Sequence, residues 1–404
     1  MPFPIATGHI SRAMVLTAVS LTVPGLLIRF GVLHNGPGME ALLFGLGLLG
    51  AAFMLSWAAE VVQMDISEGF ALALLALIAV LPEYAVDMVF AWKAGVDSQT
   101  VGPLLVQHGP LALANMTGAN RLLIGLGWPM VLFIFFLRSR KRALALATAH
   151  SSEIFYLACA TAYAFIIPFK GSLSLLDAAV LIAIFAAYIV RTTRAGAGEP
   201  ELVGPAALVG GLTTVYRRLV TVLLFAYSGL IIFLSAEPFA ESLVAFGKAS
   251  GIDEFLLVQW LAPLASEAPE FLVAAIWAAR GHAQSSMGAL ISSKVNQWTL
   301  LVGTIPIVYS LGAGRIGALH LDIRQDHEIW LTAGQSIFAV AILSNLKISW
   351  YGAILLATLF VAQLIFSEIR MEVFAVYLLL ALVILIRDRK HLPSLAKIGL
   401  TFKR

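Results

Sequence analysis

Charged residues and cysteine are both scarce in this sequence of 404 residues. Asp, Glu, Lys and Arg together make up 12% of the chain, whereas 60% of its residues are apolar. A water-soluble domain of this length has no core large enough to hide so much apolar surface, so we predict an integral membrane protein. The single cysteine, Cys159, excludes an internal disulfide and a thiolate metal cluster.

Catalytic signatures are also missing. The sequence has no glycine-rich phosphate loop after a strand, no Ser-His-Asp grouping with a supporting context and no two-histidine metal helix. We therefore expect neither an enzyme nor a resident cofactor. The net charge of +3 does not indicate a nucleic-acid partner, because the basic residues gather in loops between apolar runs. The expected partners are the lipid bilayer and small inorganic cations, and the oligomeric state stays open.

Apolar runs of the length needed to cross a bilayer as helices, roughly 18 to 25 residues, recur along the chain. The first run lacks a cleavage site of small residues after it, so we interpret it as a retained span rather than a signal peptide. The fourth and ninth are interrupted by polar and glycine positions, as in helices that break where they line a cavity. We place twelve spans, at 13–33, 39–60, 67–92, 108–137, 144–168, 173–190, 216–246, 253–279, 285–311, 328–346, 349–366 and 371–387.

Lys and Arg are unevenly distributed among the loops that join these spans. With both termini placed on one side, that side holds seventeen of these residues and the other side holds seven. Cytoplasmic loops carry such an excess, so the sequence predicts a multi-pass protein of the cell membrane with both termini in the cytoplasm.

A glutamate directly after a proline occurs twice within a long apolar run. The two copies are Pro82-Glu83 and Pro269-Glu270, and they lie 187 positions apart. A carboxylate at membrane depth is costly and persists mainly where it faces a partner, an ion or a water-filled path. The proline removes a backbone donor and frees carbonyl groups that can bind a cation. The duplication therefore indicates a transporter with an ion site near the middle of the membrane.

The surroundings of the Pro-Glu pairs are duplicated as well. An acidic leader precedes each pair, at 65–70 and 251–255, and a polar break that contains glycine follows, at 114–120 and 288–294. Further on, residues 152–155 (Ser-Glu-Ile-Phe) resemble residues 327–330 (His-Glu-Ile-Trp). We predict an all-α membrane protein, a polytopic helical bundle of two five-helix repeats that are inverted because five is an odd number of spans. The predicted parts are an extra helix in 1–38, repeat 1 in 39–190, a cytoplasmic linker in 191–215, repeat 2 in 216–366, and an extra helix with a basic tail in 367–404.

These motifs resemble those of the sodium/calcium exchanger superfamily of cation antiporters. Its two repeats carry Gly-Thr-Ser-Leu-Pro-Glu on one helix and Gly-Asn-Val-Val-Gly-Ser-Asn on the next, and the match covers about residues 39–366. The resemblance implies ten core helices, a cation site between the Pro-Glu helices and the broken helices, and alternating access. It also implies that Glu83 and Glu270 are the central metal ligands, assisted by Asn115, Asn120 and the backbone near Leu81 and Ala268.

The sequence departs from the family pattern at positions that would bind ions. Ala79 and Val80 replace the hydroxyl residues of the first repeat, and Ser266 and Glu267 replace those of the second. In the second break an alanine stands at 289 where the family has Asn or Asp. The later Asn becomes Lys294, next to Ser293, and in the first break Arg121 directly follows Asn120.

The charges of the candidate ion-binding residues limit what these changes mean. Asp87 lies one turn after Glu83, and Glu267 lies three residues before Glu270, so four carboxylates are expected to share the site. Against Arg121 and Lys294 they leave a formal charge of −2. We hypothesise that proton coupling, or a built-in cation, replaces at least one sodium site of the family. Alternatively, Asp87 and Glu267 neutralise the two basic residues in buried pairs.

The preferred function is secondary active cation antiport, with Ca²⁺ exchanged against Na⁺ or H⁺ at a midplane carboxylate site. Two alternatives remain: a monovalent Na⁺/H⁺ antiporter, and a non-transporting protein of exchanger fold whose ion site is closed by Arg121 and Lys294. One cluster falls outside this scheme, because the spacing of its residues fits no metal signature and is more typical of a solvated loop. It consists of His320, Asp322, Asp326 and His327.

Overall fold

The computed structural model describes residues 4–65, 81–100, 109–195, 202–393 and 397. The chain divides into two compact units, which we call unit 1 (Met1–Val89 with Thr192–Pro269) and unit 2 (Phe90–Arg191 with Glu270–Arg404). Both Pro-Glu helices contribute to both units. Helix α4 (Leu81–Thr100) passes from unit 1 to unit 2 after Val89, and α12 (Glu254–Arg280) does so after Pro269. Glu83 therefore belongs to unit 1 and Glu270 to unit 2.

Among its described residues, unit 1 contains three long helices and one short one in addition to the first parts of α4 and α12. These are α1 (Pro4–Arg29), α2 (Pro37–Val62), α11 (Thr214–Ser250) and the six-residue α10 (Pro205–Gly210). Trp57 of α2 packs with Ala18 of α1 and with Ala206 and Val209 of α10 in one apolar cluster. The predicted linker at 191–215 therefore contains a buried helix, which its glycine and proline content hides from a reading of the sequence. Pro205 lies in the first turn of α10, where a backbone N–H has no acceptor within the helix. Proline, which lacks this N–H, is therefore tolerated there.

Asp65, just beyond the end of α2, binds the start of α11. Its Oδ2 accepts from Nε of Arg217 at 2.9 Å and its Oδ1 from the same guanidinium at 2.8 Å, while Arg218 adds a bond of 2.9 Å. The hydrogen bonds from Arg217 are the main cause that lowers the pKa of Asp65 from 3.8 to about 2. Asp65 thus stays ionised, and it fixes the end of one apolar helix to the beginning of another.

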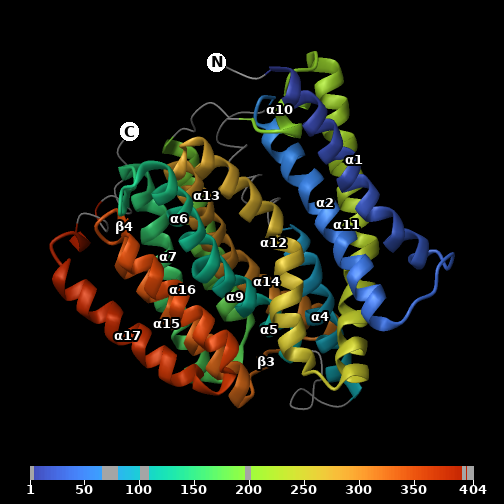
Figure 1. The fold of residues 1–404 in the computed structure, drawn as a ribbon. Coiled ribbons are helices and arrows are strands. Elements are labelled where there is room, and N and C mark those ends of the chain that lie inside the picture. The colour runs from blue at the N-terminus through green and yellow to red at the C-terminus, as the bar shows by residue number, and fades with distance from the viewer. Residues whose placement is uncertain (1–3, 66–80, 101–108, 196–201, 394–396, 398–404) are drawn as a thin grey trace. The chain divides into compact units, whose positions relative to one another are not determined.

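Unit 2 contains the remaining helices (Figure 1). Helix α17, the predicted extra C-terminal helix, packs along α15 and is therefore part of the body of this unit. The helices are α5 (Gly109–Leu122), η1 (Leu123–Gly127), α6 (Trp128–Ser139), η2 (Thr148–His150), α7 (Ser151–Ala164), α8 (Ile166–Lys170), α9 (Leu175–Ala195), α13 (Ala283–Asn296), η3 (Gln297–Leu301), α14 (Val302–Ala313), α15 (Ile323–Leu343), α16 (Trp350–Ile365), η4 (Ser367–Ile369) and α17 (Arg370–Arg387).

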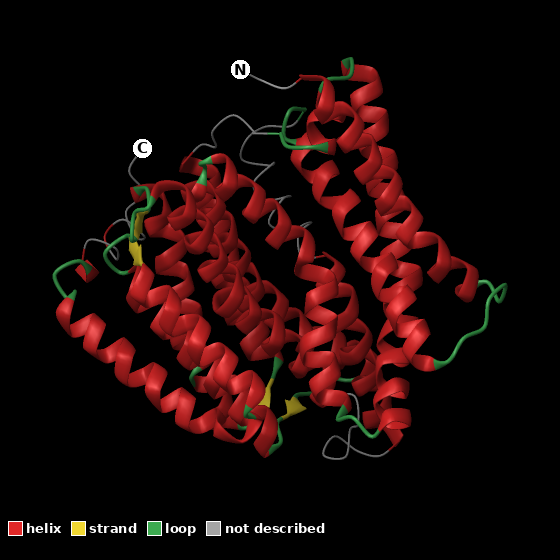
Figure 2. Cartoon of the chain, in the orientation of Figure 1, coloured by secondary structure: helices red, strands yellow, loops and turns green. Residues whose placement is uncertain are grey.

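Two short antiparallel strand pairs cross-connect the chain within unit 2. Strand β1 (Ala143–Ala145) pairs with β4 (Lys347–Ser349), and β2 (Ser172–Leu173) pairs with β3 (Leu319–His320). Strand β1, the first of repeat 1, thus pairs with β4, the second of repeat 2. Strand β2, the second of repeat 1, pairs with β3, the first of repeat 2. This is the pairing that a twofold relation between repeats produces. The strand pairs lie at opposite ends of the unit (Figures 1 and 2).

The strands correct one predicted span. The run at 144–168 was expected to be helical throughout, but β1 occupies its beginning and α7 starts only at Ser151. Residues 143–145 are apolar, and an apolar run of this length does not by itself distinguish a strand from a helix. The pairing partner at 347–349 lies far away in the sequence and decides the outcome.

The prediction of an all-α membrane protein is confirmed. Eight helical segments of the described residues are long and apolar enough to cross a membrane. Their outward faces carry large apolar side chains, for example Phe233 of α11, which is 80% exposed, and Leu379 of α17, which is 62% exposed. The charged residues Glu83, Arg121 and Lys294 are buried instead. Residues 67–80 of the third predicted span, including Ala79 and Val80, lie outside the described residues.

The two predicted broken helices are continuous, and each contains a π-helical turn. The α5–η1–α6 segment turns at Leu123–Gly127, and the α13–η3–α14 segment at Gln297–Leu301. The backbone N–H of Trp128 reaches back five residues to the carbonyl of Leu123. A π turn shifts the hydrogen-bond register without ending the helix, and such turns are frequent at functional sites. The breaks predicted at 114–120 and 288–294 lie within regular turns of α5 and α13, and each π turn begins three residues after the predicted break.

Candidate functional site

Four of the candidate residues lie in unit 1 and all are buried. Helix α4 carries Glu83 and Asp87 one turn apart, each with 1% of its surface exposed. Helix α12 carries Ser266 and Glu267, with 7% and 2% exposed. The hydroxyl of Ser266 donates within its own helix, to the carbonyls of Ala262 at 3.2 Å and Pro263 at 3.3 Å. Its oxygen can still accept or bind a cation, because a hydroxyl has two lone pairs.

In unit 2, Glu270 is joined to the second π-containing helix. The hydroxyl of Ser293 on α13 donates to Oε2 of Glu270 at 2.7 Å. This bond ties the Glu270 side chain of α12 to α13. Neither Glu270 nor Ser293 is fully buried, in contrast to the unit 1 carboxylates.

Lys294, the next residue, contacts Asn120 of the first π-containing helix. Its Nζ donates to Oδ1 of Asn120 at 2.6 Å and to the backbone carbonyl of Asn120 at 3.2 Å. The amide nitrogen of Asn120 donates to the carbonyl of Met116 at 2.8 Å, which leaves its oxygen to face the ammonium. Nζ also lies 4.4 Å from the ring centroid of Trp298. Asn120 and Lys294 are both 0% exposed.

Asn115, the other amide candidate, lies five residues before Asn120 on α5 and is 0% exposed. Its role as an ion ligand stays a prediction. The corresponding position of the second repeat holds Ala289, so the two repeats do not offer the same oxygen atoms.

Arg121 uses its charge in a separate ionic network of unit 2. It forms a buried ion pair with Glu328 of α15 and donates to Oε1 of Gln363 at 2.7 Å. Glu328 also binds Arg370, the first residue of α17, with 2.6 Å between Oε1 and Nε. Arg121 is therefore paired with an acid that the sequence analysis did not count among the site residues. Without Arg121, the formal charge of the remaining candidate set is −3.

Sequence reasoning missed Glu328 and Trp298 as functional neighbours. Glu328 was noticed only as part of a repeated tetrapeptide, although a carboxylate at the start of a predicted span is itself a signal for a buried cation partner. Trp298 was not among the candidate residues. Its position four residues after Lys294 on a helix is the signal that would have placed its ring beside the ammonium.

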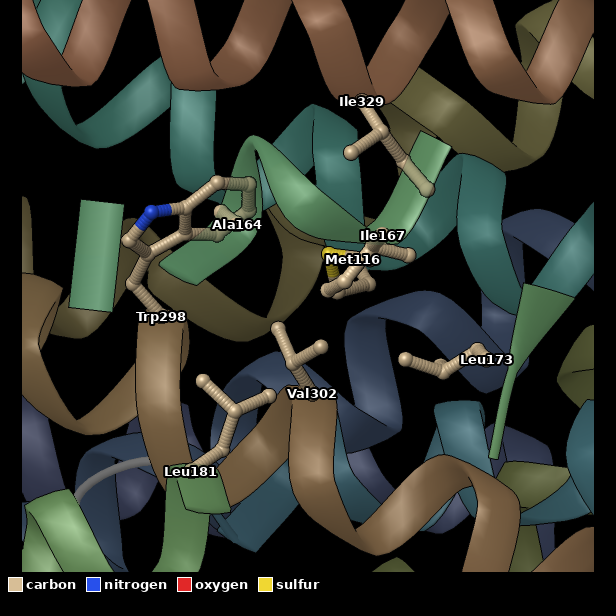
Figure 3. Close-up of a pocket in the computed structure, with 8 residues that line it drawn as sticks. All are labelled: Met116, Ala164, Ile167, Leu173, Leu181, Trp298, Val302 and Ile329. Carbon is tan, nitrogen blue, oxygen red and sulfur yellow. The ribbon is translucent and has the colours of Figure 1, made fainter. Parts of the chain in front are cut away.

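A narrow apolar cavity of about 10 Å³ borders this region (Figure 3). Its wall includes Met116 of α5 and Trp298 of η3, with Ile329 of α15 and residues of α7, α8, β2, α9 and α14. A space of this size holds at most about one water molecule, and its lining is almost wholly apolar.

The cluster of His320, Asp322, Asp326 and His327 is more ordered than the predicted solvated loop. His320 belongs to β3, and Asp322 caps α15 by accepting from the backbone N–H of Gln325 at 2.7 Å. The Gln325 side chain accepts from the N–H of Asp322 at 3.1 Å, which completes a capping box. Among the described residues, no group of three or more His, Cys, Asp or Glu side chains is arranged to hold a metal ion.

The profile of the family described as sodium/calcium exchanger protein matches residues 40–194 and 220–368. The chain belongs to this family. The resemblance inferred from the motifs is thus confirmed, and the protein is a membrane transporter rather than an enzyme.

Solved structures of exchangers resemble this one. The H⁺/Ca²⁺ exchanger CAX is 46% identical, with a TM-score of 0.90 and a match that covers 96% of this chain and 98% of that chain. The Ca²⁺/H⁺ antiporter protein YfkE (16% identity, TM-score 0.64, 88% and 98% covered) and the sodium-calcium exchanger NCX_Mj (16% identity, TM-score 0.53, 81% and 98% covered) share the fold. A search of curated protein sequences gave no significant match.

Proposed function

We propose that this exchanger moves Ca²⁺ in one direction and protons in the other, with Glu83 and Glu270 as the principal Ca²⁺ ligands. The observation that carries the proposal is the similarity to the H⁺/Ca²⁺ exchanger CAX, which extends over nearly the whole of both chains at 46% identity. We further propose a cell-membrane location with both termini in the cytoplasm, on the basis of the Lys and Arg distribution.

The chemistry of the candidate residues suits this cargo. Ca²⁺ binds six to eight oxygen atoms from carboxylates, carbonyls and other neutral groups. Glu83 and Glu270 would supply the charge, and Asp87 and Glu267 additional carboxylates. Neutral oxygens would come from Asn115, Ser266 and Ser293, whereas the side-chain oxygen of Asn120 accepts from Lys294. In this proposal the ligands converge near the middle of the membrane, and the site that they form opens alternately to its two sides.

Protons are the natural counter-ion for such a site. Once Ca²⁺ leaves, several carboxylates in a region shielded from water would repel one another and lack solvation. Protonation removes this cost and allows the site without Ca²⁺ to open again to the side from which Ca²⁺ is taken up. The burial of Glu83, Asp87 and Glu267 supports this part of the proposal, since each is at most 2% exposed.

Flux measurements on the purified protein in liposomes test the proposal. We expect Ca²⁺ uptake when the lumen is acidic, in the absence of Na⁺, and acidification of the outside as Ca²⁺ enters. Glu83→Gln and Glu270→Gln are expected to abolish this uptake while leaving the protein in the membrane fraction. Glu368→Gln, which makes the same change at an exposed residue of η4, is the matched control and is expected to retain it.

Three results would contradict the proposal in different ways. Na⁺-driven proton movement that does not require Ca²⁺ would favour the monovalent antiporter. Ca²⁺ uptake that requires Na⁺ and ignores the pH gradient would replace the proton as counter-ion. No flux of any cation by correctly folded protein would favour the non-transporting alternative.

A further inference from the structure

Asn120 and Lys294 occupy equivalent positions in the two halves of unit 2. Each lies three residues before a five-residue π turn, Asn120 before Leu123–Gly127 and Lys294 before Gln297–Leu301. At the next position, Arg121 of the first half corresponds to Val295 of the second half. The first half therefore presents an amide oxygen at the point where the second half presents an ammonium group.

The contact between these equivalent residues has the form of a cation bound by oxygen ligands. One residue, Asn120, offers both its side-chain oxygen at 2.6 Å and its backbone oxygen at 3.2 Å to the same nitrogen. The face of Trp298 supports the positive charge from another side, as aromatic rings do for ammonium groups. A free monovalent ion such as K⁺ is likewise bound by carbonyl oxygens that replace its hydration shell.

Arg121, the other cation near this position, is engaged differently. Its guanidinium contacts Glu328 and Gln363, and Glu328 in turn contacts Arg370. These contacts tie Arg121 to α15, α16 and α17. Lys294 is thus the basic residue that contacts the oxygen atoms of the equivalent repeat position, and the two cations have separate roles.

We propose that the ammonium group of Lys294 is a tethered cation that fills a monovalent-ion position formed by Asn120. The position is then closed to Na⁺ and K⁺, and the protein distinguishes its cargo from monovalent metal ions partly by carrying its own occupant. This inference deepens the proposed function and rests on it for its consequence for transport, but the occupancy of the position can be tested without transport.

Cation-dependent thermal unfolding of purified protein tests the occupancy. Unfolding is followed in NaCl, KCl and choline chloride at equal ionic strength, because an ion that binds only the folded state raises the melting temperature. Wild type is expected to melt at the same temperature in all three salts. Lys294→Asn removes the tether and repeats the amide of the first half, and Na⁺ or K⁺ is expected to raise its melting temperature over that in choline by about 2 °C or more.

Two control variants separate the position from the charge. Lys294→Met removes the ammonium without adding an oxygen ligand, so it is expected to show a smaller metal-ion effect than Lys294→Asn. Lys248→Asn makes the same change at an exposed residue at the end of α11 and is expected to behave as wild type. Monodisperse elution on size exclusion confirms folding of each variant.

The proposal is overturned if wild type is itself stabilised by Na⁺ or K⁺ relative to choline, or if folded Lys294→Asn does not discriminate between the salts. If Lys294→Asn does not fold, the wild-type measurement and Ca²⁺ uptake by wild type decide the matter, since uptake must be equal with Na⁺, K⁺ or choline on both sides. Absence of Ca²⁺ flux in wild type would refute the proposed function, whereas the melting data would still test the tethered cation.

Discussion

Arg121 and Glu328 form an ion pair in which the two side chains are 1% and 0% exposed. The pair joins α5, which carries Asn115 and Asn120, to α15, and through Arg370 it extends to α17. Removal of one partner of a buried ion pair leaves an uncompensated charge in a medium that solvates it poorly. In this network the loss of Glu328 would leave two such charges.

Glu328→Gln is therefore expected to lower the free energy of unfolding by about 3–5 kcal/mol. Chemical or thermal unfolding in detergent, followed by tryptophan fluorescence, measures the change. Glu368→Gln, at an exposed position, is expected to stay within about 0.5 kcal/mol of wild type. Equal stability of the two variants would show that the Arg121–Glu328 pair does not hold the helices together.

Ser293→Ala is expected to weaken Ca²⁺ binding without abolishing transport. It removes the hydrogen bond of 2.7 Å to Glu270 and one proposed neutral oxygen ligand, but it leaves the principal ligand Glu270 in place. A hydrogen bond to a charged group contributes about 1.5–3 kcal/mol, so the Ca²⁺ concentration for half-maximal uptake should rise by about 10-fold or more. The maximal rate is expected to change much less.

The neighbouring serine provides the matched control for this experiment. Ser292 shares a hydrogen bond of 2.7 Å with the hydroxyl of Tyr188 and not with Glu270. Ser292→Ala is therefore expected to keep the wild-type Ca²⁺ dependence. A similar loss of affinity in both variants would mean that small changes anywhere on α13 disturb the site, and that the Ser293–Glu270 bond has no special role.

Asp65→Asn is expected to remove a pH-dependent part of the stability. The pKa of Asp65 is lower in the folded protein, about 2, than its usual 3.8. The ionised form is thus favoured by folding, so the stabilisation is complete above the usual pKa and is lost as the pH falls towards 2. The difference in melting temperature between wild type and Asp65→Asn should be constant near neutral pH and shrink below about pH 4.

Arg217→Gln tests the origin of this effect, because hydrogen bonds from Arg217 are its main cause. This variant is expected to lose stability at neutral pH and to show a weaker dependence on acid than wild type. A melting-temperature difference for Asp65→Asn that does not change with pH would contradict the assignment.

Gly95→Ala and Gly312→Ala are expected to destabilise the protein by forcing α4 and α14 apart. An added Cβ at Gly95 would lie 2.2 Å from the carbonyl oxygen of Tyr309, and one at Gly312 would lie 2.4 Å from that of Trp92. Small residues permit such close helix contacts in membrane proteins. Because backbone atoms cannot move aside cheaply, we expect a loss of about 1–3 kcal/mol in unfolding experiments.

Gly229, in the interior of α11, is the control for this pair. An added Cβ there meets no atom within 4 Å. Gly229→Ala is expected to leave stability unchanged or to raise it by about 0.4–1 kcal/mol, since alanine has the higher helix propensity. If all three variants behaved alike, helix propensity would govern the outcome and close packing of α4 on α14 would not.

The sequence predicted the helical segments and the family well, because local patterns decide them. The apolar runs located α2, α9 and α12 to within a few residues, and the repeated Pro-Glu pair led to the family. Features that depend on distant partners were missed. Strand β1 exists because residues 347–349 pair with it, and the π turns at 123–127 and 297–301 have no distinctive composition.

The charges of the candidate site show the same limit. Arg121 and Lys294 carry the same formal charge in the sequence and were given the same possible roles. Their contacts differ because Arg121 meets Glu328 of α15, whereas Lys294 meets Asn120 of α5. The convergence of Glu83 and Glu270, which belong to different units, stays a prediction that the Glu→Gln flux experiments address.

The exchange of strands between the two halves of unit 2 has a mechanical consequence. With β1 bonded to β4 at one end and β2 to β3 at the other, a sliding motion between the halves would have to break backbone hydrogen bonds at both ends together. The two halves of unit 2 are thus tied to each other by backbone hydrogen bonds at both ends, in addition to their side-chain packing.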